Sequence, residues 1–109
     1  MIKRAAILGT GSWGTAIATL LASKLDEVCL IGRNEKTAEE INHQHTNHYY
    51  LPDQPLPSNI TASTKLAKAT EYPLILFVVP TSATETTAEI LAQTNLPKDT
   101  VLILSLIHI

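Results

Sequence analysis

Residues 5–25 of the chain read AAILGTGSWGTAIATLLASKL. The apolar run Ala5–Leu8 is typical of a buried strand, and three glycines, at positions 9, 11 and 14, follow it closely. Over Trp13–Leu25 the apolar residues recur every three or four positions, which predicts an amphipathic helix. The stretch therefore predicts a strand, a glycine-rich turn and a helix in immediate succession.

The turn has the pattern G-x-G-x-x-G in the context that makes this pattern informative, after a strand and before a helix. Gly9 permits a sharp turn, Gly11 lets a phosphate oxygen approach the backbone, and Gly14 removes bulk where the helix crosses the strand. The first N–H groups of the helix have no internal partners, and the helix dipole favours an anion there. The alternative is a tight turn without a ligand, but the context favours a pyrophosphate site for NAD(H) or NADP(H).

The tip of the second predicted strand bears on the choice of cofactor. About 20 residues after the turn, an Asp or Glu usually binds the ribose 2′-hydroxyl of NAD, whereas this chain has Gly32-Arg33-Asn34. Arg33 would pair with a 2′-phosphate in a two-point contact, and Asn34 would cap the next helix and donate to the same phosphate. We therefore expect NADP(H) to be preferred, with NAD as the second possibility. Alternatively, Arg33 is a solvated loop cation and NAD binds without a dedicated acidic residue. Glu35 lies close enough in the sequence to leave this alternative open.

The rest of the chain predicts an α/β fold. Its other apolar runs do not alternate with polar residues, which indicates strands buried on both faces of a doubly wound parallel sheet, the Rossmann type. Prolines exclude a helix or a central strand from Tyr49 to Asn59, so we expect a loop there. The predicted strands are Ala5–Leu8, Val28–Ile31, Ile60–Ala62, Leu74–Val79 and Val101–Leu104, and the predicted helices are Trp13–Leu25, Glu35 to about Asn47, and Ser82 to about Gln93.

Length and composition limit the classes of protein. The 109 residues support one domain, although a full doubly wound domain often has roughly 150. Apolar residues make up 45% and charged residues 17%, and a net charge of −2 gives no general attraction to nucleic acid or to a membrane surface. Cys29 is the single cysteine, which fits the reducing cytoplasm. No apolar run approaches the ~18–20 residues that span a bilayer.

Several weaker signals accompany the glycine turn. His43, His45 and His48 lie close together, but no further ligands converge on them, so we predict a solvated helix end and no metal site. Trp13 either packs beside the next loop or lies against the cofactor. Tyr49 and Tyr50 open the proline-rich stretch as a lid or as a small packed cluster, and packing is favoured for at least one.

With these motifs in order, the chain resembles the bacterial NAD(P)-dependent glycerol-3-phosphate dehydrogenases. The resemblance rests on GTGSWGTA (9–16), VCLIGRN (28–34), Tyr50-Leu51-Pro52 and VVPTS (78–82). It implies reduction of dihydroxyacetone phosphate to sn-glycerol 3-phosphate for phospholipid synthesis, and it leaves a homodimer open for the full-length enzyme. It also implies contacts with NADPH at Ser12, Trp13, Arg33, Asn34 and Tyr50.

The end of the chain departs from that family. The family carries Ser-Lys-Gly after the fifth strand, whereas here Ser105 is followed by Leu106-Ile107-His108-Ile109. We therefore expect residues 1–105 to be a partial dinucleotide-binding domain, residues 106–109 to be a divergent tail, and the helical substrate domain to be absent. No catalytic residue is assigned in this chain, which we expect to bind a dinucleotide weakly and to turn over nothing alone. The rival interpretations are a non-catalytic dinucleotide-sensing module and a dehydrogenase of another substrate.

Overall fold

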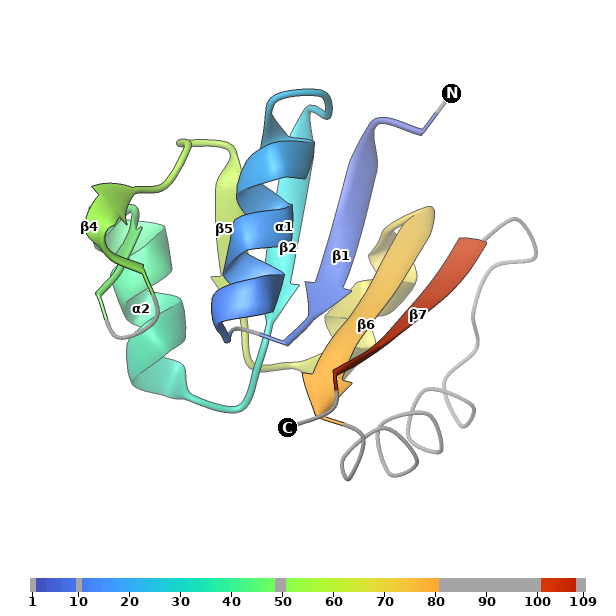
Figure 1. The fold of residues 1–109 in the computed structure, drawn as a ribbon. Helices are drawn as coiled ribbons and strands as arrows, with labels where there is room; N and C mark the ends of the chain where they lie inside the picture. The colour runs from blue at the N-terminus through green and yellow to red at the C-terminus, as the bar shows by residue number, and fades with distance from the viewer. Residues whose placement is uncertain (1, 10, 49–50, 81–100, 108–109) are drawn as a thin grey trace.

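A computed structural model describes residues 2–9, 11–48, 51–80 and 101–107 of the chain. Within these residues a parallel sheet with the strand order β5-β2-β1-β6-β7 forms the centre of the molecule (Figure 1). Its strands are β1 (Arg4–Leu8), β2 (Glu27–Ile31), β5 (Ile60–Ser63), β6 (Leu74–Pro80) and β7 (Val101–Ile107). All five predicted strands are confirmed; in each, one end is as predicted and the other lies one to three residues further out.

The direction of winding reverses at β1. The chain passes from β1 to β2 and β5 on one side, and then returns to form β6 and β7 on the other side. This order confirms the predicted doubly wound sheet. In such sheets the reversal opens a crevice at the carboxyl ends of the two strands concerned, which here are β1 and β6.

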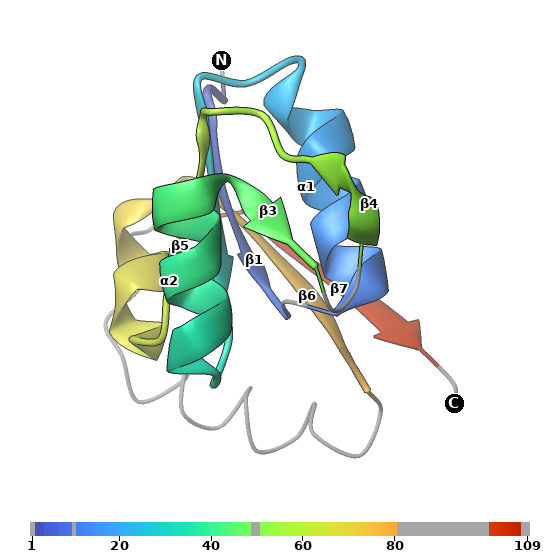
Figure 2. The same ribbon diagram turned by 90° about the vertical axis from the view of Figure 1, so that its left-hand side faces the viewer.

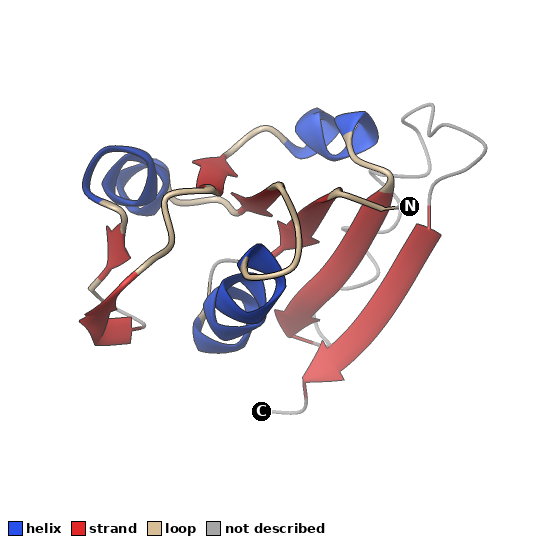
Figure 3. Ribbon diagram, turned by 90° about the horizontal axis from the view of Figure 1, so that it is seen from above, coloured by secondary structure: helices blue, strands red, loops and turns tan. Residues whose placement is uncertain are grey.

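Helices cover both faces of the sheet. Helix α1 (Ser12–Ala22) and the 3-10 helix η1 (Leu66–Glu71) lie on opposite faces, and α2 (Glu35–Gln44) lies beyond β5, as Figure 3 shows from above. The sequence predicted only a short connection where η1 is found. The predicted helix Ser82–Gln93 lies outside the described residues.

Neighbouring residues of each strand contribute to different halves of the core. One half packs beneath α1 and the other beneath η1, so both faces of the central strands are buried. This explains why the strand sequences are apolar throughout. The α1 side includes Ile7, Ala18, Val28, Leu30 and Ile60, and the η1 side includes Ala6, Leu8, Cys29, Ala69, Tyr72 and Ile75.

Both α-helices end earlier than predicted. α1 stops at Ala22, because the Asn59 side chain donates to the carbonyl oxygens of Ala22 (2.8 Å) and Leu25 (3.0 Å) and holds the chain in a turn there. α2 stops at Gln44, because His45 adopts the left-handed conformation with φ 55° and caps the helix.

The predicted loop over residues 49–59 is partly wrong. β3 (Thr46–Asn47) and β4 (Leu51–Pro55) form a separate antiparallel pair, which Figure 2 shows beside α1 and α2. Prolines are tolerated in this pair because it lies outside the central sheet. The N–H group that proline lacks is therefore not missing from the hydrogen bonds between the central strands. The sequence excluded a central strand correctly, but it did not indicate a strand at the periphery.

A polar cluster fastens the amino edge of the sheet on the η1 side. Glu27 accepts hydrogen bonds from Arg4 (3.1 Å), Tyr72 (2.6 Å) and Thr61 (3.1 Å), and the Arg4 guanidinium lies 4.5 Å from the centre of the Tyr72 ring. Burial would raise the pKa of Glu27, but these hydrogen bonds outweigh burial and hold the pKa below its ordinary value of 4.5. The ionised carboxylate therefore stabilises the folded state.

We predict that acid weakens the fold through Glu27. Because its pKa is lower in the folded chain, its contribution is complete above about pH 4.5 and is lost as the pH falls through the folded pKa. Urea unfolding followed by circular dichroism, from about pH 7 down to pH 3, should show this loss. Glu27→Gln should be less stable at neutral pH and should lose less stability in acid. A parallel pH dependence in the two proteins would contradict this role.

Candidate cofactor-binding site

The turn after β1 is shaped by one backbone conformation and one hydrogen bond. Gly9 has φ 128°, a region that residues with a side chain rarely adopt. Its N–H donates to the carbonyl oxygen of Ile31 (2.8 Å), the last residue of β2. The glycine turn and the tip of β2 are therefore held together at the carboxyl edge of the sheet.

Helix α1 begins without a capping side chain. Its N-cap is Gly11, which has no side-chain cap hydrogen bond, and the N–H of Thr15 makes the first helical bond to the Gly11 carbonyl (2.9 Å). The first turn also contains no acidic residue. Within the part of the chain that the structure describes, the helix N–H groups before Thr15 have no acceptor inside the helix, and the helix dipole favours a negatively charged acceptor there.

Helix α2 begins in the opposite way. The Oδ1 atom of Asn34 accepts from the backbone N–H groups of Lys36 (2.9 Å) and Thr37 (3.2 Å), and Glu35 lies in the first turn. The prediction that Asn34 caps this helix is confirmed. Because its oxygen is engaged in this way, only its amide nitrogen is left to donate to a ligand.

Gly14 allows α1 to start close to the turn. A Cβ atom added to Gly14 would lie 2.1 Å from the carbonyl oxygen and 3.0 Å from the carbonyl carbon of Gly9. Both atoms belong to the backbone, so no side-chain movement would relieve the clash. This agrees with the role that the sequence predicted for Gly14, and it fits a site in which a phosphate approaches the backbone.

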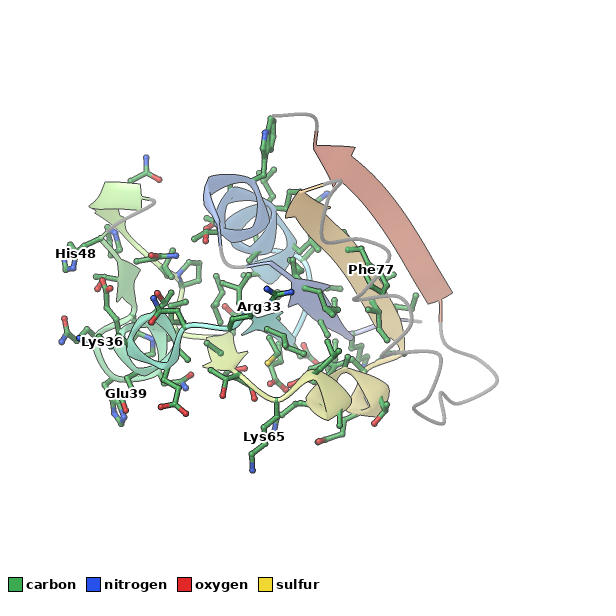
Figure 4. All side chains as sticks on the ribbon, turned by 90° about the horizontal axis from the view of Figure 1, so that it is seen from below. Arg33, Lys36, Glu39, His48, Lys65 and Phe77 are labelled. Atoms are coloured by element: carbon green, nitrogen blue, oxygen red, sulfur yellow. The ribbon has the colours of Figure 1, made fainter. Side chains whose placement is uncertain are left out.

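Arg33 lies at the same edge of the sheet as the turn. It is exposed after the end of β2, and in Figure 4, seen from the carboxyl edge, it extends over the sheet in the direction of β1. Lys36 and Lys65 instead point outward from their elements in that view. The structure thus brings the predicted cation to the edge where α1 begins.

The structure describes only some of the other residues that were predicted to contact the cofactor. Trp13, in the first turn of α1, is 61% exposed, so its ring is accessible to a ligand. The side chain of Ser12 and the whole of Tyr50 lie outside what the structure describes. His48 lies 2.7 Å from a carboxylate oxygen of Glu40, and the described residues contain no group of three or more metal-ligating side chains.

Sequence reasoning missed two buried polar residues beside the site. Thr15 and Asn47 are both 0% exposed, and the Asn47 side chain donates to the Thr15 hydroxyl (3.1 Å). Thr15 was detectable as a polar residue on the inward face of α1, in line with Ala18 and Ala22. Asn47 was not, because the sequence placed it at the end of α2.

The geometry agrees with comparisons to known proteins. Residues 4–107 match the family model of the NAD-dependent glycerol-3-phosphate dehydrogenase N-terminus. The chain belongs to this family. A glycerol-3-phosphate dehydrogenase [NAD(P)+] from Enterococcus faecalis is 47% identical over 94 residues, which are 85% of this chain and 28% of the relative. One from an Exiguobacterium species is 49% identical over 79 residues, which are 72% of this chain and 23% of the relative.

Solved structures show the same likeness. The crystal structure of glycerol-3-phosphate dehydrogenase from Coxiella burnetii matches 96% of this chain with a TM-score of 0.86 and 31% identity, and 32% of that protein is covered. The dehydrogenase from Plasmodium falciparum has a TM-score of 0.84 with 27% identity, over 94% of this chain and 32% of that protein. This family member thus spans about a third or less of the length of these relatives. None of its described helices is long and apolar enough to cross a membrane.

We predict that Gly14→Ala displaces the start of α1. The added methyl group would meet the Gly9 backbone, so the helix must shift, at a cost of about 1–3 kcal/mol or more in the free energy of unfolding. Urea unfolding measures this cost, and amide exchange localises it. Leu20→Ala, at a position of the same helix that is 71% exposed, is the control and should change stability by less than about 0.5 kcal/mol. A Gly14→Ala chain as stable as the wild type would contradict the close packing.

Proposed function

We propose that this chain is the cofactor-binding part of an NAD(P)-dependent glycerol-3-phosphate dehydrogenase. The enzyme would reduce dihydroxyacetone phosphate to sn-glycerol 3-phosphate for glycerophospholipid synthesis in the cytoplasm, with NADPH preferred. The observation that carries the proposal is the uncapped start of α1, which lies at the reversal of strand order and at the same sheet edge as Arg33. Family membership supports the reaction.

Each predicted residue has a role in this proposal. The backbone of Gly9, Gly11 and Gly14 forms the turn, and the free N–H groups at the start of α1 bind the pyrophosphate. Ser12, Trp13 and Tyr50 contact the cofactor nearby. At the tip of β2, Arg33 pairs with the 2′-phosphate of NADPH, and the Asn34 amide nitrogen donates to it.

The bound nicotinamide supplies the hydride for reduction of the ketone. The residues of this chain bind the cofactor and fix its orientation, and no described residue is assigned a catalytic role. The start of α1 fits the diphosphate, because its N-cap Gly11 offers no capping side chain and its first turn contains no acidic residue. The local dipole of α1 attracts the diphosphate although the chain has a net charge of −2.

Trp13 provides a direct test of binding. It is the single tryptophan of the chain and lies in the first turn of α1, so its emission reports on this site. Addition of NADPH should quench the tryptophan emission by energy transfer to the reduced nicotinamide, and this transfer should saturate. Excess NADP+ should compete for the site and reverse the transfer. Trp13→Phe should abolish the signal while NADPH is still bound in equilibrium dialysis. If the wild-type chain retains no NADPH in dialysis, the proposal is wrong.

Arg33 provides the test of cofactor preference. Arg33→Asp should weaken NADPH binding by about 10- to 100-fold, because a charge-assisted contact worth about 1.5–3 kcal/mol is replaced by repulsion, while NADH binding changes little. Lys3→Asp makes the same change in net charge at an exposed residue before β1, at the opposite edge, and should affect neither cofactor. Equal binding of both cofactors by wild type and Arg33→Asp would refute the role of Arg33.

A further inference from the structure

The buried contact between Asn47 and Thr15 links the β3–β4 pair to the start of α1. Asn47 lies in β3, and its side-chain nitrogen is 3.1 Å from the Thr15 hydroxyl, with both residues 0% exposed. Thr15 is also the residue whose N–H bonds to Gly11 and so closes the first turn of the helix. Asn47 therefore holds the side chain of the residue that completes the proposed phosphate cradle.

The other side of β3 is fixed to α2. One carboxylate oxygen of Glu40 accepts from the Thr46 hydroxyl (2.7 Å) and from the backbone N–H of His48 (2.7 Å). Burial opposes ionisation of Glu40, but these hydrogen bonds and the nearby His48 lower its pKa. With Glu40 on one side and Thr15 on the other, β3 bridges α2 and the first turn of α1 (Figure 2).

A buried polar pair is a demanding way to join two segments. Both partners lose their water, and the bond is favourable only in one arrangement, whereas an apolar contact would tolerate several. The pair thus specifies one position of β3 relative to α1. That position in turn fixes the first turn of α1, where the phosphate cradle is proposed.

We propose that Asn47 is a positioning residue for the dinucleotide, which acts through Thr15 on the first turn of α1. The inference rests on the proposed cofactor site, and it adds a residue that touches no phosphate itself. It implies that the β3–β4 pair and the phosphate cradle form one unit. Loss of the Asn47–Thr15 bond should therefore weaken cofactor binding by more than the accompanying loss of stability explains.

The chain offers a matched control at the other end of the same helix. Asn59 uses its side-chain nitrogen to bind the carbonyl oxygens of Ala22 and Leu25, at the end of α1 that is remote from the turn. Asn59→Ala therefore removes side-chain amide hydrogen bonds at the far end of the same helix. NADPH affinity is measured by equilibrium dialysis on the 109-residue chain, well below the unfolding temperature of each variant, together with urea unfolding.

We expect Asn47→Ala to raise the Kd for NADPH about tenfold or more, and Asn59→Ala to change it less than about twofold, although both lower stability. Thr15→Val should reproduce the loss, the double variant should be no weaker than the single ones, and Thr15→Ser should keep the affinity because it keeps the hydroxyl. Thr15→Val also serves if Asn47→Ala does not fold.

Two results would overturn the inference, and they are distinct from failure of the proposed function. If Asn47→Ala and Thr15→Val bind NADPH as the wild type does, the pair has a structural role alone. If Asn59→Ala loses as much affinity as Asn47→Ala, the effect follows general stability and not position. If the wild-type chain itself binds no NADPH, the proposed function fails and this inference fails with it.

Discussion

The close approach of α1 to the turn that leaves β1 is the constraint on which the rest of the structure depends. The backbone at Gly14 and the carbonyl group of Gly9 are so near that only a hydrogen atom fits between them as a side chain. This packing starts the helix directly at the sheet edge, beside the reversal of strand order. A side chain at this position would move the start of the helix away from the turn.

The two edges of the sheet have different characters. At the amino edge Glu27 accepts hydrogen bonds from Arg4, Tyr72 and Thr61, so this polar cluster is satisfied internally. At the carboxyl edge α1 lacks a cap, and Arg33 and Trp13 are exposed. Polar groups that are satisfied internally stabilise the fold, whereas those left open are available to a ligand. This separation supports the proposal of a local anion site in a chain whose net charge is −2.

The sequence predicted the sheet and the glycine turn because both depend on local signals. Apolar runs mark buried strands, and the spacing of Gly9, Gly11 and Gly14 marks the turn. What it missed depends on contacts between residues far apart in the chain. Asn59 ends α1 from 37 positions away, and Asn47 reaches Thr15 across 32 positions. The prolines near residue 52 led to the prediction of a loop where β4 is found, because proline excludes a central strand but is tolerated in a peripheral one.

The central claim is that the free amides at the start of α1 bind the diphosphate of the cofactor. Backbone amide chemical shifts of the isotope-labelled chain, followed during titration with NADPH and separately with inorganic pyrophosphate, test it most directly. The account predicts that the amides of residues 12–14 shift saturably with both ligands, and that Arg33 and its neighbours respond to NADPH alone. Saturable shifts confined to other parts of the chain, with residues 12–14 unmoved, would contradict it.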